Sequence, residues 1–158
     1  MTKIFFATDL HGSETCFMKF VNAACVYEVD ALILGGDITG KIVIPIVRQP
    51  DGTFNAKFSG FNWKGTKESD AEELEKKVVF SGYYPYRTDE EEMKELDSDQ
   101  TKVHALFSHL MVKRIEKWVR IAEERLKDTG VKCYISPGND DRFDIDAVLN
   151  GSHYVVNP

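Results

Sequence analysis

Three short segments of the sequence combine glycine with side chains that bind metal ions. They are TDLHG at 8–12, GGD at 35–37 and PGNDD at 137–141. Carboxylate, imidazole and amide groups in one set suit Mn, Fe, Zn, Co or Ni and do not select among these metals. We interpret four side chains from these segments as candidate ligands of divalent metal ions: Asp9, His11, Asp37 and Asn139.

The spacing within the first segment predicts that two ligands reach one ion. Asp9 and His11 are two residues apart, so in an extended chain both side chains point to the same side. Asp37 can bridge two ions through its two oxygens, and Asn139 can offer an amide oxygen to the second ion. Two ions about 3.5–4 Å apart would activate a water molecule and clamp the oxygens of a displacement at phosphorus.

Each segment also has a simpler interpretation when it is taken alone. An Asp after a strand is often only the N-cap of the next helix, and an isolated DxH, GGD or GND segment is a weak signal. The three segments together are more specific, because each one directly follows an apolar run. We therefore favour a metal site over three unrelated local roles.

Three apolar runs supply the strands that must position these ligands. They are residues 3–8, 31–34 and 131–136. Short apolar runs bounded by turn residues are typical of buried strands. Residues 14–28 carry apolar side chains at helical spacing, with Ser13 as the N-cap, so the first two strands belong to a parallel βαβ unit. Ligands bind beyond the carboxyl ends of such strands, so we expect the four candidate ligands to converge there.

The middle of the chain predicts a β-hairpin excursion and one long helix. Residues 50–52, Pro-Asp-Gly, mark the turn of a hairpin within 41–59, and Pro45 suggests that its first strand lies at a sheet edge. An apolar stripe predicts the long helix over 99–127. In the first metal-binding segment, Gly12 is expected to spare the site the crowding of a Cβ atom.

Shorter elements are predicted from capping signals and from the last residues. Three short helices are expected at Ser69 with Glu72, at Thr88 with Glu91, and at Asp144 with a stop at Gly151. The sequence HYVVNP at 153–158 predicts the beginning of another strand. The core would then be a parallel βαβ arrangement with the hairpin as an excursion from it.

Composition limits the classes of partner. The 158 residues fit a single domain. The net charge of −6 and the absence of a basic stripe argue against nonspecific nucleic-acid binding. Three widely spaced cysteines are typical of free thiols in a reducing compartment, so we expect a cytoplasmic protein. The short apolar run at the N-terminus predicts neither a signal peptide nor a membrane span.

The order DLHG, GGD, PGNDD resembles that of the calcineurin-like metallophosphoesterases, over Lys3 to about Pro158. The resemblance implies an α/β fold, the αββα sandwich, of which this chain would form the N-terminal portion. It also implies a dinuclear site that hydrolyses phosphomonoesters or phosphodiesters with metal-bound hydroxide. By this resemblance Asp9 and His11 would hold the first metal and Asp37 would bridge. Asn139 would hold the second metal and touch the substrate phosphate.

One departure from the family lies beside Asn139. The family often has a histidine directly after this asparagine, where it contacts the substrate and assists the leaving group, and here that residue is Asp140. We interpret Asp140, with Asn139, as the candidate catalytic residues, Asp140 acting as an acid if it is protonated or metal-paired. Asp141 matches the acidic residue that follows in the family and is expected to support the ligands from behind.

The second departure concerns the histidines that complete the family's site. The GHxH-type motif is missing, and His153 is the one histidine after Asn139. His104 and His109 are five residues apart on the predicted long helix, about 140° of rotation, so they do not share a face. We therefore expect residues 1–158 to be a single, incomplete domain. The rest would come from a longer chain, from a second copy or from a partner chain.

Two functions from different classes remain open. The first is a metal-dependent phosphoesterase, using two divalent ions, that acts on a small phosphorylated substrate. The alternative is a non-catalytic scaffold or binding module of the same fold with a degraded metal site. The metal content of the purified protein distinguishes them, because a scaffold would retain little metal.

Overall fold

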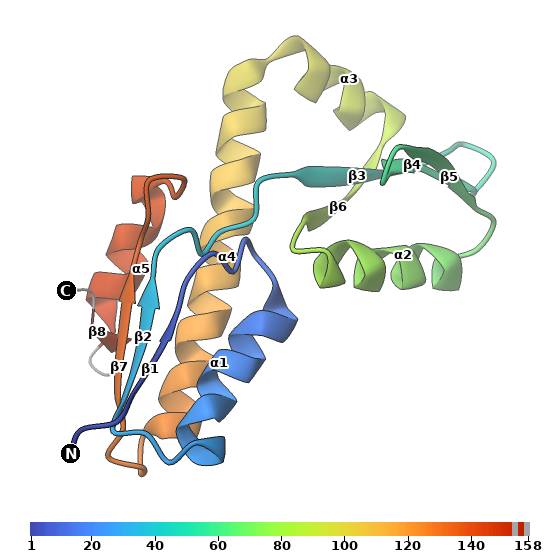
Figure 1. The fold of residues 1–158 in the computed structure, drawn as a ribbon. Helices are drawn as coiled ribbons and strands as arrows, with labels where there is room; N and C mark the ends of the chain where they lie inside the picture. Colours follow the sequence, from blue (N-terminus) through green and yellow to red (C-terminus); the bar gives the residue numbers. More distant parts are fainter. Residues whose placement is uncertain (153–154, 157–158) are drawn as a thin grey trace.

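The three predicted buried strands form one parallel sheet in the computed structural model, which describes residues 1–152 and 155–156 (Figure 1). The strands are β1 (Ile4–Ala7), β2 (Ala31–Gly35), β7 (Lys132–Ser136) and β8 (Val155–Val156), in the order β1-β2-β7-β8. All their pairings are parallel. The three loops with the candidate ligands therefore leave the same end of the sheet. β8 lies in the predicted last strand, of which residues 153–154 and 157–158 lie outside the described residues.

Two helices cover one face of this sheet. The predicted helices at 14–28 and 99–127 are confirmed as α1 (Glu14–Val26) and α4 (Gln100–Leu126). The Ser13 hydroxyl accepts a hydrogen bond from the Cys16 amide at 3.3 Å, which makes Ser13 the predicted N-cap. Phe17 of α1 stacks on Trp118 of α4, with ring centroids 4.4 Å apart. Every second residue of β2 and β7 joins this core: Leu32, Leu34, Cys133 and Ile135.

The predicted hairpin is confirmed and belongs to a second, mixed sheet. Its strands are β3 (Val43–Arg48), β4 (Phe54–Phe58), β5 (Phe61–Gly65) and β6 (Tyr84–Asp89), in the order β5-β4-β3-β6. Helix α2 (Glu68–Phe80) packs on this sheet around a separate buried cluster, and α3 (Glu90–Ser98) follows β6. We call residues 43–98 the accessory lobe. The protein is therefore mixed α/β, as predicted.

The prediction that Pro45 marks an edge strand is wrong. β3 is an interior strand, paired with β4 on one side and with β6 on the other. The antiparallel pairing with β4 begins at Ile46, so Pro45 lies just outside that ladder. Its missing N–H group therefore removes no hydrogen bond to β4, and the strand can lie inside the sheet.

The predicted short helices are present, but their starts differ. Helix α2 begins after Lys67 and is capped through Asp70, and α3 is capped by Asp89, whose carboxylate accepts from two backbone amides. Helix α5 (Asp146–Gly151) follows a 3₁₀ turn at Phe143–Ile145, so the prediction of Asp144 as its N-cap is wrong. Asp144 accepts hydrogen bonds from the Ser108 hydroxyl and the Arg142 guanidinium instead.

The two sheets are separate in space. Figure 1 shows the accessory lobe extending away from the first sheet, with α4 between the two in this view. The face of the first sheet opposite α1 and α4 is open in the described residues, where Ile4 is 55% exposed and Phe6 is 61% exposed. Within the part of the chain that the structure describes, no helix has both the length and the apolar composition needed to cross a bilayer.

Glycines allow the accessory lobe to meet the loop after β1. A Cβ atom on Gly12 would lie 2.2 Å from the Gly82 carbonyl oxygen, and one on Gly82 would lie 2.2 Å from the His11 carbonyl oxygen. Gly12 is therefore required by the backbone of the accessory lobe rather than by crowding among the ligands. Arg114 of α4 joins both sides, because it donates to the carbonyl oxygens of Gly12 at 2.8 Å and Tyr83 at 3.0 Å. Burial lowers the pKa of this guanidinium.

Candidate metal centre

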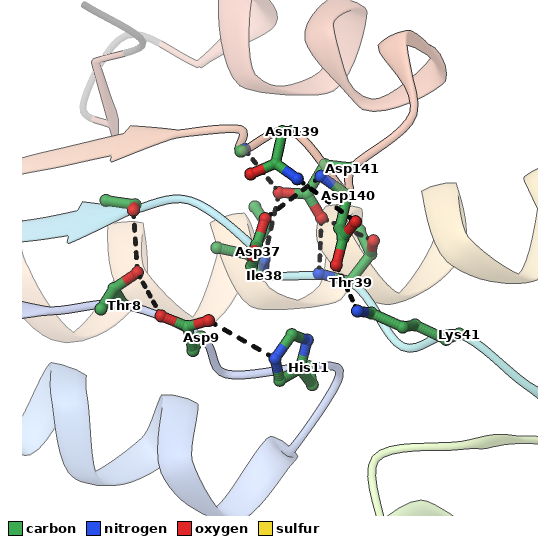
Figure 2. Close-up of polar contacts among 12 residues, drawn as sticks. Thr8, Asp9, His11, Asp37, Ile38, Thr39, Lys41, Asn139, Asp140 and Asp141 are labelled. Carbon is green, nitrogen blue, oxygen red and sulfur yellow. Dashed lines mark hydrogen bonds and ion pairs between the residues drawn. The ribbon is translucent and has the colours of Figure 1, made fainter.

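Three of the four predicted ligands form one compact group. Ligand atoms of Asp9, His11 and Asp37 all lie within 4.8 Å of one another. The Nε2 atom of His11 is 3.5 Å from Oδ1 of Asp9, and Figure 2 shows Asp37 facing them from the loop after β2. Two carboxylates and one imidazole form an oxygen and nitrogen donor set that suits the divalent ions named above.

The backbone that presents these ligands is not extended, in contrast to the argument from spacing. Asp9, His11 and Asp37 all have positive φ angles, 58°, 45° and 51°. The loops hold these conformations through backbone hydrogen bonds from Asp9 N to Gly36 O at 3.1 Å and from His11 N to Asp37 O at 3.0 Å. Left-handed conformations are uncommon outside glycine and cost free energy. The two loops therefore constrain each other at the points where the ligands emerge.

Asp9 is oriented from behind, and His11 keeps an unused nitrogen. The Thr8 hydroxyl lies within hydrogen-bond distance of Asp9 Oδ2, at 2.8 Å, and of the Gly35 carbonyl oxygen, at 2.9 Å (Figure 2). The Nδ1 atom of His11 is buried and finds no hydrogen-bond partner in residues 1–152 and 155–156. The Nε2 atom, in contrast, lies 3.5 Å from Oδ1 of Asp9, so Nε2 is the nitrogen placed to share an ion with Asp9.

The third loop borders this group through Asn139 and Asp140. The Asp140 amide donates to Oδ1 of Asp37 at 3.2 Å, which joins the loop after β7 to the loop after β2. Asn139 lies beside Asp37 in Figure 2, and its amide nitrogen donates to Asp140 Oδ1 at 3.3 Å. The structure thus places all four predicted ligands at one end of the sheet, with Asn139 at the margin of the Asp9, His11 and Asp37 group.

Asp141 connects the two loops. Its carboxylate accepts hydrogen bonds from the Gly138 amide at 2.8 Å, the Ile38 amide at 3.1 Å, and the Thr39 amide and hydroxyl at 2.9 and 2.6 Å. Three of these donors are backbone amides, and two of them belong to the loop that carries Asp37. Asp141 therefore supports the loops that carry Asp37 and Asn139 from behind, the position expected for it from the sequence.

Replacing Asp141 with Asn is expected to lower the free energy of unfolding by at least about 2 kcal/mol. The amide retains one acceptor oxygen and turns an NH₂ group toward backbone donors, and a hydrogen bond to a charged group contributes about 1.5–3 kcal/mol. Urea denaturation followed by circular dichroism measures the change. Asp128→Asn, on an exposed carboxylate, is the matched control, and equal stabilities of the two variants would contradict the supporting role.

Lys41 is a residue of this site that the sequence analysis missed. Its ammonium group forms an ion pair with the Asp140 carboxylate (Figure 2). This hydrogen-bonded pairing raises the pKa of Lys41 and lowers the pKa of Asp140. A lowered pKa disfavours the protonated form that the predicted role of Asp140 as an acid needs. An exposed lysine among 20 basic residues does not stand out in the sequence as a site residue. The one indication is its position, four residues after Asp37.

Asp9 and Asp37 are not helix caps: Ser13 caps α1, and the chain after Asp37 enters β3. His104 and His109 are exposed on α4 and do not belong to the Asp9, His11 and Asp37 group.

No known protein family, curated protein or solved structure matches the chain. The candidate centre is therefore interpreted from its own geometry.

Proposed function

We propose that this chain is a metal-dependent phosphoesterase whose divalent ions bind at the Asp9, His11 and Asp37 group. One observation carries the proposal: ligand atoms from two different loops lie within 4.8 Å of one another, and each ligand has a left-handed backbone. Strained backbone of this kind concentrates at functional sites. Two carboxylates and one imidazole converge here, and no equal positive charge balances the negative charge of the carboxylates. Such a group favours a bound cation.

The proposed roles follow the positions of the side chains. Asp9 and His11 would hold one ion, Asp37 would contribute to both ions, and Asn139 at the margin would hold the second ion and contact the phosphate. When bound, such ions lower the pKa of coordinated water and neutralise charge on the phosphate oxygens. The chain's own contribution is to fix the ligands, which the Thr8 hydroxyl and the Asp141 carboxylate do from behind.

The scaffold alternative is supported by the small number of imidazoles. Within the described residues, His11 is the one histidine in the candidate group, whereas the resemblance implies further histidines. We propose that additional ligands reach the site from a second copy or a partner chain. The αββα sandwich would require a second sheet on the open face of the first sheet, which carries Ile4 and Phe6. Light scattering of the purified chain measures whether it forms an assembly.

We propose a cytoplasmic location because the cysteine thiols are free. Cys16, Cys25 and Cys133 are all free, and the first two are exposed. Exposed free thiols persist in reducing compartments. Burial raises the pKa of Cys133 to about 12, so its thiol stays protonated and unreactive at neutral pH.

The proposed function is tested by metal binding and hydrolysis measured together. The chain is purified without chelator, its metal content is determined, and Mn²⁺-dependent release of p-nitrophenol from p-nitrophenyl phosphate and from bis-p-nitrophenyl phosphate is followed. Stoichiometric Mn²⁺ with turnover of either ester supports a phosphoesterase. Stoichiometric metal without turnover supports the need for a partner, and the absence of bound metal supports the scaffold.

A further inference from the structure

Lys41 places a positive charge at the rim of the candidate centre. It lies on the loop after β2, its side chain is 51% exposed, and its ammonium group is paired with Asp140. The carboxylates of Asp37 and Asp9 also contribute to the raised pKa of Lys41. Figure 2 shows Lys41 reaching toward the loop after β7 from the side of Thr39.

The other nearby cations are engaged elsewhere. Arg142 donates to the Asp144 carboxylate at 2.8 Å. The Arg114 guanidinium donates to the backbone carbonyl oxygens of Gly12 and Tyr83. Among the residues that the structure describes, Asp9 pairs with His11 and Asp140 pairs with Lys41. Since His11 is a candidate ligand, Lys41 is the cation that remains for an anionic substrate.

We propose that Lys41 binds the phosphate group of the substrate and that Asp140 serves as its counter-ion until the phosphate arrives. This inference rests on the proposed function. An ammonium group offers three donors on a flexible stem, so it can turn from the Asp140 carboxylate to a phosphate oxygen without moving the backbone. In the empty site, Asp140 restrains Lys41. When phosphate is present, the Asp140 carboxylate competes with it for the Lys41 ammonium group.

The positive charge of Lys41 favours a terminal phosphate over a phosphodiester. A phosphomonoester dianion carries twice the charge of a diester monoanion, so its Coulomb attraction to one added cation is about twice as large at equal distance. The carboxylates of Asp9, Asp37 and Asp140 repel either anion, and Lys41 offsets part of that repulsion. We therefore assign phosphomonoesters as the substrate class that gains most from Lys41.

Isothermal titration of the Mn²⁺-loaded protein with inorganic phosphate tests the role of Lys41 in phosphate binding. In Lys41→Met the dissociation constant for phosphate is expected to rise about 10- to 100-fold, the range of one charge-assisted hydrogen bond. Lys41→Arg should retain part of the affinity, because the positive charge remains. Asp140→Asn should bind phosphate more tightly than the original protein, since the competing carboxylate is gone. Lys41→Met should not weaken Mn²⁺ binding, because the variant removes a positive charge near the candidate ligands.

The controls separate this inference from the proposed function. Lys117→Met removes another ion-paired lysine, on α4 beside Glu14, and should leave phosphate binding unchanged. If the original protein binds no phosphate in the presence of Mn²⁺, the proposed function and this inference fall together. If it binds phosphate and Lys41→Met binds equally well, the assignment of Lys41 is overturned while the proposed function stands. A weaker phosphate affinity in Asp140→Asn would contradict the role of Asp140 as a competitor.

Discussion

Replacing Asp37 with Asn is expected to lower kcat/KM for p-nitrophenyl phosphate by at least about 100-fold, because losing a residue that merely supports a metal ligand typically costs about 10- to 100-fold. Asp37 lies within 4.8 Å of ligand atoms of both Asp9 and His11, so it is the residue that joins the two loops at the candidate centre. An amide at this position keeps one oxygen donor but loses the negative charge. The same variant should therefore bind less than one equivalent of Mn²⁺ at concentrations that saturate the original protein.

The Asp37→Asn variant tests the site without removing its main structural contact. Oδ1 of Asp37 accepts a hydrogen bond from the Asp140 amide, and the amide oxygen of Asn can accept the same bond. Circular dichroism and thermal unfolding should thus remain close to those of the original protein. Asp97→Asn, on an exposed carboxylate of α3, controls for the loss of charge. Full activity and full Mn²⁺ binding in Asp37→Asn would refute the metal centre.

The position of the candidate site could be predicted from the sequence because it depends on strand order. Three apolar runs, each followed by a polar segment, were sufficient to predict parallel strands with the ligands at one end. The conformation of Asp9, His11 and Asp37 could not be predicted, because their positive φ angles depend on hydrogen bonds between two loops far apart in the chain. Alternation along an extended strand predicted that Asp9 and His11 lie close together, which they do, but through an incorrect local geometry.

The accessory lobe shows where sequence patterns become insufficient. The hairpin of β3 and β4 is clear in the sequence, but the strand pattern of β5 is weak: Phe61 is exposed, and Trp63 is only partly buried. β5 is stabilised by its pairing with β4. The contact of Gly82 with the loop after β1 joins residues about seventy positions apart, so local composition contains no information about it.

Gly82→Ala is expected to lower the free energy of unfolding by at least about 2 kcal/mol more than Gly60→Ala, which is the typical size of an overpacking penalty. The two glycines have nearly the same backbone, with φ angles of +82° and +81°. Both variants therefore bear the left-handed penalty of about 1–2 kcal/mol. They differ in their surroundings: a Cβ atom on Gly82 would lie 2.2 Å from the His11 carbonyl oxygen, whereas one on Gly60 meets nothing within 4 Å.

The clash at Gly82 is with backbone, so a side-chain rotation cannot relieve it. Either the loop that carries His11 or the chain at Gly82 must shift, and His11 would then move relative to Asp9 and Asp37. Gly82→Ala should consequently lose Mn²⁺ affinity as well as stability, while Gly60→Ala loses a little stability and keeps its Mn²⁺ affinity. Thermal unfolding and Mn²⁺ titration measure both quantities. Equal losses in the two variants would mean that the accessory lobe does not hold the His11 loop in place. The backbone pairing of this loop with residues 36–38 and the Arg114 contact would then maintain its conformation.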